Sequence, residues 1–498
     1  MIVRGPLALL VVVALAAPAP AAGQTRDCEL VRARKARNIT SGTTETWFIS
    51  GPAEFTCTDS TVVRADSAVL TRGSSLQLIG NVFYADSART LEADRAIYYM
   101  EAARLVAQDN VVLTDRRENG SVIRAPQLTY ERAGPARPEA RTIVTGRPHA
   151  ILYPGDAGAA EPGDTAAQPF EVDADWMEIQ GERRFMAVGA VEIVRGEVRS
   201  GARTATFDQD NDLLVLTGDA WIRQEDLRLG AQGIEVRLEG EQLREVIARR
   251  DAHLEGRDLN VTATTIRLEF AEGELQRLVA VTPPAVAASA VDTAPTDPQA
   301  AEAPPADTGR ARAVAVAREL RLVADSIDAL APGEELRELV AVGDAFAERQ
   351  LDSLSTGLPS LVATDWASGD SIYAYFTTAA PSPDSAAAVA ALPPDSSARQ
   401  EAGRDTAEIV LERLVVVGPG GRAQALYRVS RRREESGPPA INYTVADRIV
   451  LILSEGEIKE AEATGEVRGR YLEPVRGSVG GGVAPASGGR QPPGTGSR

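Results

Sequence analysis

The chain has 498 residues, a formal net charge of −18 and only 5% aromatic residues. The acidic balance argues against a nucleic-acid partner, because binding to phosphates requires Lys and Arg side chains that release counterions, and against nonspecific adhesion to anionic membranes. A chain of this length can form several domains or one array of repeats, and the scarcity of aromatic residues argues against large aromatic cores.

The first 23 residues have the pattern of a secretory signal peptide. Arg4 supplies a positive charge, an apolar run covers residues 7–17, and small residues from Ala19 to Gly23 offer a cleavage site. We therefore expect an exported protein whose mature chain begins at Gln24. The alternative is that this segment is kept as an anchor. No later stretch has the roughly 18 to 20 apolar residues that a membrane-spanning helix needs.

Cys28 and Cys57 are the only cysteines, and both lie shortly after the signal segment. Cysteines of an exported chain meet an oxidising compartment, which favours a disulfide between them. Such a bond would join the first strands of the mature protein. A catalytic redox pair is disfavoured because the chain has no C-x-x-C sequence.

Four stretches rich in Ala, Pro, Asp, Gly and Ser interrupt the chain. They contain too little apolar surface to offset the chain entropy lost on folding, so we expect disordered linkers and a disordered tail. These stretches are 154–169, 282–309, 378–405 and 475–498. The segments expected to fold are 27–153, 170–281, 310–377 and 406–474.

Apolar and polar residues alternate within these segments, as in Leu76-Gln77-Leu78, over short runs bounded by Gly, Asp or Asn. This pattern predicts short, half-buried strands. A loose unit recurs, in which Ala-Asp opens a strand and Gly or Asn precedes a second short strand. A unit this short buries its apolar face only by stacking on its neighbours. Residues 240–250 and 310–330 are the best candidates for helices, but we interpret both as strand-turn-strand and predict an all-β fold.

The motifs between Val63 and Arg132 resemble the OstA-like, or LptA-type, family of lipopolysaccharide-transport proteins. In order, they are R-A-D-S-A, then G-x-x-L-x-L-x-G-N-V-x-Y-x-D ending at Asp86, T-L-E-A-D-R-A-I-Y-Y, N-V-V-L-T-D and I-R-A-P-Q-L-T-Y. The order and spacing of these motifs carry the resemblance. Segment 170–281 repeats the pattern more loosely, as a second OstA-like domain, and the two later segments keep fragments of it.

The resemblance implies a folded-over antiparallel sheet, an open jelly-roll solenoid, whose apolar interior carries lipid A acyl chains toward the outer membrane. It also implies a periplasmic location, free or associated with the outer membrane. The implied partners are lipopolysaccharide or another acylated envelope lipid, and other OstA-like components or further copies of this chain joined by β-strand augmentation.

Strand alternation in segment 27–153 gives a candidate lipid-binding set on the inner face. The set consists of Leu76, Leu78, Val82, Tyr84, Leu91, Ala93, Ile97, Val111 and Leu113. The residues expected to face water are Gln77, Asn81, Glu92 and Asp94. A closed core that binds nothing requires the same alternation, so this alternative stays open.

Two groups of charged residues have a functional and a structural interpretation. The cluster Arg32, Arg34, Lys35 and Arg37 could bind the phosphates of a lipid head group, but charged edge strands that prevent unwanted pairing are routine. The recurrent Asp of the Ala-Asp unit could be a catalytic or metal-binding residue. A strand-start residue bonded to a turn amide explains it more simply.

Recognisable catalytic and metal-binding patterns are absent from the sequence. His149 and His253 have no partner at metal-ligand spacing, and no G-x-S-x-G or phosphate-binding loop occurs. Residues 208–212 begin like a calcium loop, but Leu213 occupies the position that requires glycine. We therefore expect no enzymatic activity, metal or cofactor. The alternatives are an adhesin-like surface solenoid with a closed core and a β-helical carbohydrate-active enzyme.

Overall fold

The computed structural model describes residues 28–57, 60–116, 120–134, 137–153, 168–181, 183–239, 242–283, 311–349, 364–378, 409–429, 440–454 and 456–472. Nearly all of them lie in antiparallel strands, which confirms the all-β prediction. The helical elements among them are two short 3-10 turns, η2 (Gln209–Asn211) and η3 (Pro332–Glu334). No helix in these ranges is long and apolar enough to cross a bilayer. The expected signal peptide and most of each expected linker lie outside these ranges.

The chain divides into two compact units, residues 1–188 and 189–498, and the division falls within β13 (Arg184–Arg195). The strands of unit 1 are β1 (Cys28–Arg32), β2 (Lys35–Ser41), β3 (Thr44–Cys57), β4 (Val62–Thr71), β5 (Ser75–Ala85), β6 (Arg89–Tyr99), β7 (Arg104–Asp115), β8 (Val122–Glu131), β9 (Arg141–Thr145), β10 (His149–Leu152), β11 (Phe170–Asp173) and β12 (Trp176–Gln180).

Unit 2 continues with strands of the same kind. They are β14 (Val198–Asp208), β15 (Leu213–Gln224), β16 (Leu227–Glu239), β17 (Gln242–Glu255), β18 (Asn260–Ala271), β19 (Glu274–Val281), β20 (Ala313–Ala317), β21 (Leu320–Ala324), β22 (Ser326–Leu330), β23 (Glu338–Arg349), β24 (Asp365–Thr378), β25 (Ile409–Val417), β26 (Ala423–Val429), β27 (Ala440–Ala446), β28 (Arg448–Ser454), β29 (Glu457–Thr464) and β30 (Arg468–Leu472). Both helical candidates are strands, in β17 and in β20 to β22.

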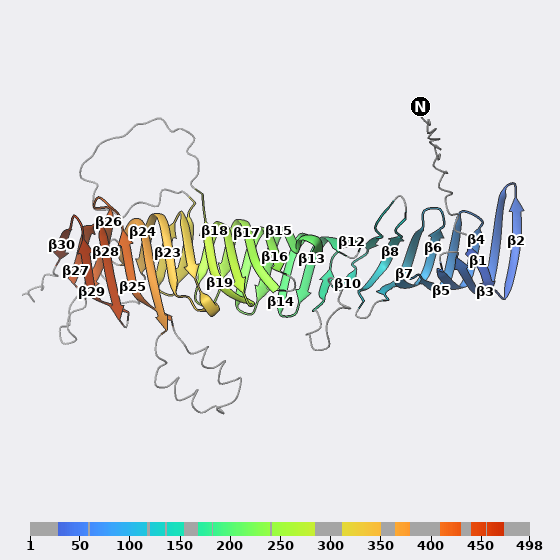
Figure 1. The fold of residues 1–498 in the computed structure, drawn as a ribbon, viewed down its shortest axis with the longest axis horizontal. Coiled ribbons are helices and arrows are strands. Elements are labelled where there is room, and N and C mark those ends of the chain that lie inside the picture. Colours follow the sequence, from blue (N-terminus) through green and yellow to red (C-terminus); the bar gives the residue numbers. More distant parts are fainter. Residues whose placement is uncertain are drawn as a thin grey trace, which may run out of the picture. The chain divides into compact units, whose positions relative to one another are not determined.

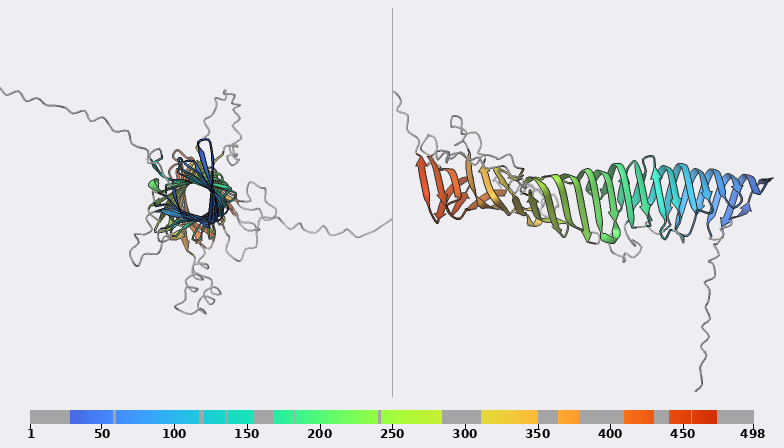
Figure 2. Two further views of the ribbon diagram at one scale, coloured as in Figure 1. Left: turned by 90° about the vertical axis from the view of Figure 1, so that its right-hand side faces the viewer. Right: turned by 90° about the horizontal axis from the view of Figure 1, so that it is seen from above.

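Successive strands of unit 1 pair with one another in chain order. From β3 to β8 each strand is the antiparallel partner of the next one, while β3 also pairs with β1 and β2, and β8 pairs with β9 and β10. Figure 1 shows these strands, coloured blue to teal, side by side. In the end-on view of Figure 2 they run around a common axis. Their inward-facing side chains, such as Leu76 and Leu91, are buried.

The Gly and Asn residues that were expected to end short strands instead lie inside longer ones. Gly80 and Asn81 within β5 have φ of 78° and 44°, and Asp109 and Asn110 within β7 have φ of 63° and 53°. The pairing register shifts at each pair, which marks a β-bulge. Two consecutive residues with positive φ bend the strand, and the repeated bends fold the sheet over itself. The prediction of short strands was therefore wrong for the bent strands, whereas β9 to β12 and β20 to β22 have only four or five residues each.

Of the recurrent Asp residues, Asp66 and Asp94 lie at bends inside strands, whereas Asp175, Asp325 and Asp447 directly precede β12, β22 and β28 as expected, and Asp447 Oδ1 accepts a hydrogen bond from the turn amide of Gly421. Asn81 Nδ2 donates a hydrogen bond of 2.8 Å to Asp66 Oδ2, and Asn110 Nδ2 donates one of 2.8 Å to Asp94 Oδ2. A Cβ atom at Gly80 would lie 2.5 Å from Asp66 Oδ2, so a larger residue does not fit there. These contacts link the bends of neighbouring strands, and they give the repeated Asp a structural role.

Unit 2 uses the same bends. Paired residues with positive φ lie inside β15 at Gly218-Asp219, inside β17 at Arg250-Asp251 and inside β23 at Gly343-Asp344. A Cβ atom at Gly343 would lie 2.8 Å from Asp325 Oδ2, as at the bends of unit 1. The repeat predicted from the sequence therefore continues beyond residue 310, in the form of bends that face one another on adjacent strands.

Candidate functional site

The inner face of unit 1 contains eight of the nine predicted lipid-binding residues. Each of the eight is at most 6% exposed, so the inner face is a packed apolar surface. The eight are Leu76, Leu78, Val82, Tyr84, Leu91, Ala93, Val111 and Leu113. The four residues expected to face water are exposed, namely Gln77, Asn81, Glu92 and Asp94.

Ile97 is the exception, because the prediction that it lies on the inner face was wrong. It is only half-buried and lies on the outer face, opposite Gln77. The bend of β6 contains the single residue Asp94, whereas the bend of β5 contains two, so the inward alternation of β6 shifts by one position. Ala96 and Tyr98 consequently point inward, at 3% and 1% exposure. A bulge of one residue leaves no signal in a simple alternating pattern.

Folding every strand at its middle brings two rows of turns together. We call one row lip A; it consists of the turns β4–β5, β6–β7, β8–β9 and β12–β13. We call the other row lip B; it consists of the turns β3–β4, β5–β6 and β7–β8. The line along which the two lips meet is the seam. Met100 N donates to Ser74 O along lip A, and Arg116 N donates to Ala88 O along lip B. Among the described residues between 60 and 134, every backbone hydrogen bond between two turns joins turns of the same lip. Side chains therefore make the connections across the seam.

Asp86 of lip B is the centre of these connections. Its Oδ1 accepts hydrogen bonds from Ala88 N at 2.9 Å and Arg89 N at 2.8 Å, which fix the carboxylate within its own turn. Its Oδ2 accepts a bond of 3.2 Å from Tyr84 Oη. Asp86 is 3% exposed. Because a buried carboxylate is costly unless it is paired, its remaining partners are important for the fold.

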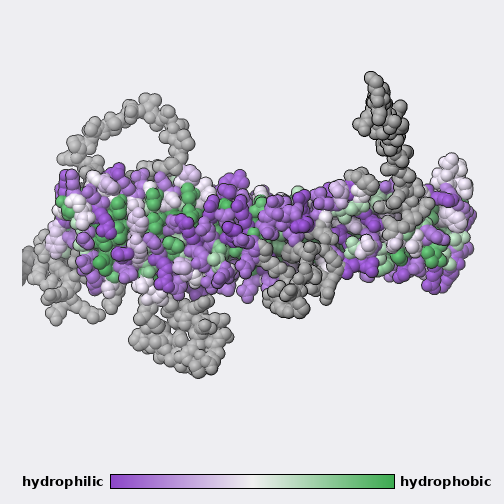
Figure 3. Space-filling model, in the orientation of Figure 1, coloured by the Kyte–Doolittle hydropathy of each residue, from purple (hydrophilic) through white to green (hydrophobic). Residues whose placement is uncertain are grey.

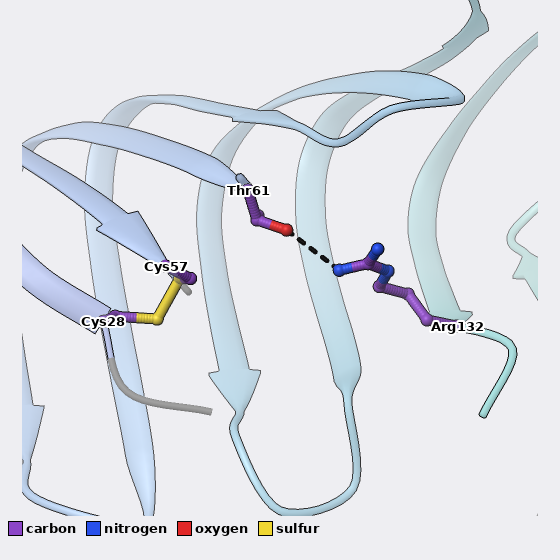
Figure 4. The surroundings of a disulfide bond; sticks show 4 residues. All are labelled: Cys28, Cys57, Thr61 and Arg132. Atoms are coloured by element: carbon purple, nitrogen blue, oxygen red, sulfur yellow. Dashed lines mark hydrogen bonds between the residues drawn. A yellow bond between two sulfur atoms is a disulfide. The ribbon is translucent and has the colours of Figure 1, made fainter. Parts of the chain in front are cut away.

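Those partners come from the opposite lip. Tyr130 Oη, from the lip A end of β8, donates to Asp86 Oδ2 at 3.3 Å. Arg132 Nε lies 3.5 Å from the same oxygen, and Arg132 Nη1 donates to Thr61 Oγ1 of lip B at 2.9 Å. Figure 4 shows Arg132 reaching across to Thr61. One arginine thus holds two turns of the facing lip.

Arg89 makes the reverse connection, from lip B to lip A. Its Nη1 donates to Thr142 Oγ1 and its Nη2 to Gly181 O, both at 3.3 Å. Its guanidinium carbon lies 5.3 Å from the ring centroid of Tyr130, within cation–π range. We call Thr61, Asp86, Arg89, Tyr130, Arg132 and Thr142 the clasp. The clasp closes the seam of unit 1 with polar side chains above an apolar interior.

Burial raises the pKa values of Tyr130 and Tyr84, the two tyrosines that donate to Asp86. Desolvation, followed by the negative charge of Asp86, raises the pKa of Tyr130 to about 12. Desolvation and Asp86 also raise the pKa of Tyr84 well above its ordinary value. Both hydroxyls therefore remain hydrogen-bond donors at physiological pH, which is the protonation state that the carboxylate of Asp86 requires.

A disulfide joins Cys28 of β1 to Cys57 of β3, which are directly opposite in the antiparallel register. This is the pairing considered from the sequence. Cys57 N also donates to Thr61 O, so the bond lies next to the clasp (Figure 4). The first strand of the sheet is thus covalently attached beside lip B.

Each end of the repeat has open strands. Among the described residues, β1 and β2 pair only with β3, β29 pairs only with β28, and β30 pairs only with β27. The basic cluster predicted from the sequence lies exposed on the first of these edges, at Arg32, Arg34, Lys35 and Arg37. The last edge has exposed side chains of both signs, with Glu457, Glu460 and Glu462 on β29 and Arg468 and Arg470 on β30.

The remaining candidate ligands have local partners. His149 Nδ1 lies 3.0 Å from Asp173 Oδ1, and His253 Nδ1 lies 3.2 Å from a backbone oxygen. In the loop that resembles a calcium site, Asp208 caps η2 by accepting a bond from Asp210 N. The structure shows no group of three or more His, Cys, Asp or Glu suited to a metal within the ranges that it describes.

No protein-family model matches the chain, and no curated protein matches its sequence. Its function is therefore argued from the inner face, the clasp and the open edges.

Proposed function

We propose that this protein is an exported periplasmic carrier that shields the acyl chains of lipopolysaccharide, or of another acylated envelope lipid, between the two halves of its folded sheet. Transport is passive, with the direction supplied by other components. The observation that carries the proposal is a folded apolar sheet whose two lips, among the described residues of unit 1, are joined by side chains.

The seam supports lateral uptake of an acyl chain. A strand cannot be separated from its neighbour without breaking a ladder of backbone hydrogen bonds, whereas the clasp is a small set of side-chain contacts. A clasp can be opened and closed while every strand keeps its pairing. Uptake between the lips therefore leaves the fold intact.

The free energy lost when the clasp opens is comparable to the free energy gained when an acyl chain enters the interior. Five contacts of Arg89, Tyr130 and Arg132 cross the seam. Each contributes roughly 1 kcal/mol, and the charged ones contribute more, so the loss of all five costs about 5 to 8 kcal/mol. Each buried CH₂ of an acyl chain contributes about 0.8 kcal/mol, so a chain of roughly ten carbons gains about 8 kcal/mol. One or two inserted chains can offset the opened clasp, and a single short chain cannot.

The open edges support assembly with further sheets. Unpaired strand edges add strands from other chains by backbone hydrogen bonding. The first edge is basic and the last edge carries side chains of both signs, so the attraction between two sheets rests on their unpaired backbone groups. The proposed partners are therefore further copies of this chain or other proteins with OstA-like sheets.

A structural solenoid with a closed core is the second candidate, and the burial of the inner face favours it. Leu76, Tyr84 and Leu91 are fully buried by neighbouring side chains. A carrier must rearrange this interior when it takes up lipid, whereas a structural solenoid keeps it unchanged. Lipid content therefore separates the two candidates.

The test is mass spectrometry of organic extracts from protein purified out of its native envelope. A carrier yields acylated lipid in amounts comparable to the protein. Val82→Asp places a charge on the inner face and removes the lipid, while Val106→Asp places the same charge on the outer face and leaves it. Val82→Thr, which keeps the volume, retains the fold and reduces the lipid. Wild-type protein without lipid would refute the carrier and leave the closed core.

A further inference from the structure

The outer face of the first strands contains a hollow that is separate from the interior. Its volume is about 260 Å³, and its walls come from β2, β3, β4 and β5. Lys35 and Arg37 alternate along β2 and face the same way, opposite Ser50 and Phe48 of β3. The residues that line it are Lys35, Arg37, Phe48, Ile49, Ser50, Ser67, Ala68, Val69 and Ile79.

The two cations of this hollow differ from their neighbours in being unneutralised. On the neighbouring strands, Arg64 pairs with Glu54 at 3.1 Å and Arg72 with Glu45 at 2.9 Å. In the part of the chain that the structure describes, Lys35 and Arg37 make no ion pair. A chain with an excess of acidic residues therefore has a local site of free positive charge, which attracts an anionic partner.

Large apolar side chains surround the cations. Phe48 is 45% exposed, Ile79 is 48% exposed, and Ile39, two positions beyond Arg37 on β2, is 42% exposed. Val31 of β1 is 62% exposed. Figure 3 shows exposed hydrophobic residues among polar ones over this N-terminal end of unit 1. A free phosphate ion would account for the cations but would leave this apolar surface in water.

We propose that this face, which we call the basic-apolar face (Lys35, Arg37, Ile39, Phe48 and Ile79), docks unit 1 onto an anionic phospholipid surface. Basic side chains contact lipid phosphates while neighbouring apolar side chains reach the boundary of the acyl region, which is the combination used by proteins that lie on membranes. The occupant of the hollow is a phospholipid head group. The proposal does not depend on the interior binding lipid.

The overall charge of −18 does not prevent this docking. Charges are screened over about 8 Å at physiological ionic strength, so distant carboxylates contribute little at the hollow. Glu54, on this face, already has an arginine partner, and Asp66, which precedes Ser67 of the hollow, accepts a hydrogen bond from Asn81. The local field is therefore set by Lys35 and Arg37 together with the exposed Arg32 and Arg34 of the same edge.

The test measures binding of the secreted full chain to vesicles of phosphatidylcholine, alone or mixed equally with phosphatidylglycerol. The wild type binds the anionic vesicles, and salt weakens the binding. Lys35→Gln/Arg37→Gln weakens it about 25-fold, since each cation near an anionic surface contributes about fivefold. The control Arg249→Gln/Arg277→Gln removes the same charge from two exposed ion pairs of unit 2 and changes binding less than twofold.

The apolar part is tested separately with Phe48→Ser/Ile79→Ser, which weakens binding to anionic vesicles at least tenfold and leaves the salt dependence in place. Its control, Val342→Ser/Ile452→Ser, removes two similarly exposed side chains from unit 2 and has no effect. Circular dichroism checks that each variant is folded. Equal binding to neutral vesicles, equal losses in test and control pairs, or binding of inorganic phosphate without vesicle binding would each overturn the proposal.

Discussion

Removing the carboxylate of Asp86 should open the seam of unit 1. Asp86→Ala leaves two buried tyrosine hydroxyls, two backbone amides and the guanidinium of Arg132 without their acceptor. Breaking one partner of a buried charge pair costs about 3 to 5 kcal/mol, and each unsatisfied buried donor adds roughly 1 kcal/mol. We expect the free energy of unfolding of unit 1 to fall by about 4 kcal/mol, with relaxation of the turn offsetting part of the larger sum.

Hydrogen exchange read by mass spectrometry is the assay, because it resolves unit 1 from unit 2. The protection of backbone amides from exchange should fall most at the turns of both lips and least at the bends of β5 and β7. Glu54→Ala is the matched control, since it removes a carboxylate of unit 1 whose ion pair with Arg64 is exposed, and exposed pairs contribute about 0 to 1 kcal/mol. Equal effects of the two substitutions, or a loss of protection confined to lip B, would refute the clasp.

Three further outcomes follow from the same contacts. Gly80→Ala should lower the free energy of unfolding by about 1 to 3 kcal/mol, because its φ is 78° and its Cβ would meet Asp66; an unchanged thermal midpoint would contradict the role of the bend. Reducing the bond between Cys28 and Cys57 should cost about 3 kcal/mol and increase hydrogen exchange in β1; unaltered exchange would contradict its anchoring role. Folding raises the pKa of Tyr130 from 10 to about 12, so the stabilisation contributed by Tyr130 is complete below pH 10 and is lost as the pH rises toward 12. Tyr130→Phe should reduce the loss of stability at alkaline pH, measured as the free energy of unfolding against pH. An unchanged pH dependence would contradict the burial of this hydroxyl against Asp86.

The inner face could largely be predicted from the sequence, because burial against one side of a strand forces an alternating pattern. Leu76 and Leu78, or Val111 and Leu113, differ by two positions and point the same way. Ile97 could not be assigned correctly, because the single-residue bend at Asp94 reverses the alternation without changing the composition. The bends themselves were visible as Gly, Asp and Asn, which are also the residues of ordinary turns.

The clasp could not be predicted. Asp86, Arg89 and Arg132 lie at strand ends, where charged residues normally face water, and they are 44 or more positions from some of their partners. Only the folding of the sheet brings lip A to lip B and buries these groups. The disulfide was easier to anticipate, because two cysteines leave a single possible pairing within the chain.

The central claim is that lipid occupies the inner face, and neighbouring residues of β6 test it directly. Tyr98 is 1% exposed and points inward, while Tyr99 is on the outer face. A photoreactive p-azidophenylalanine in place of each tyrosine keeps the ring and reports what lies against it in the native envelope. The account predicts an acyl-lipid adduct at position 98 and none at position 99. Adducts only to protein at position 98, in a folded chain, would contradict the carrier.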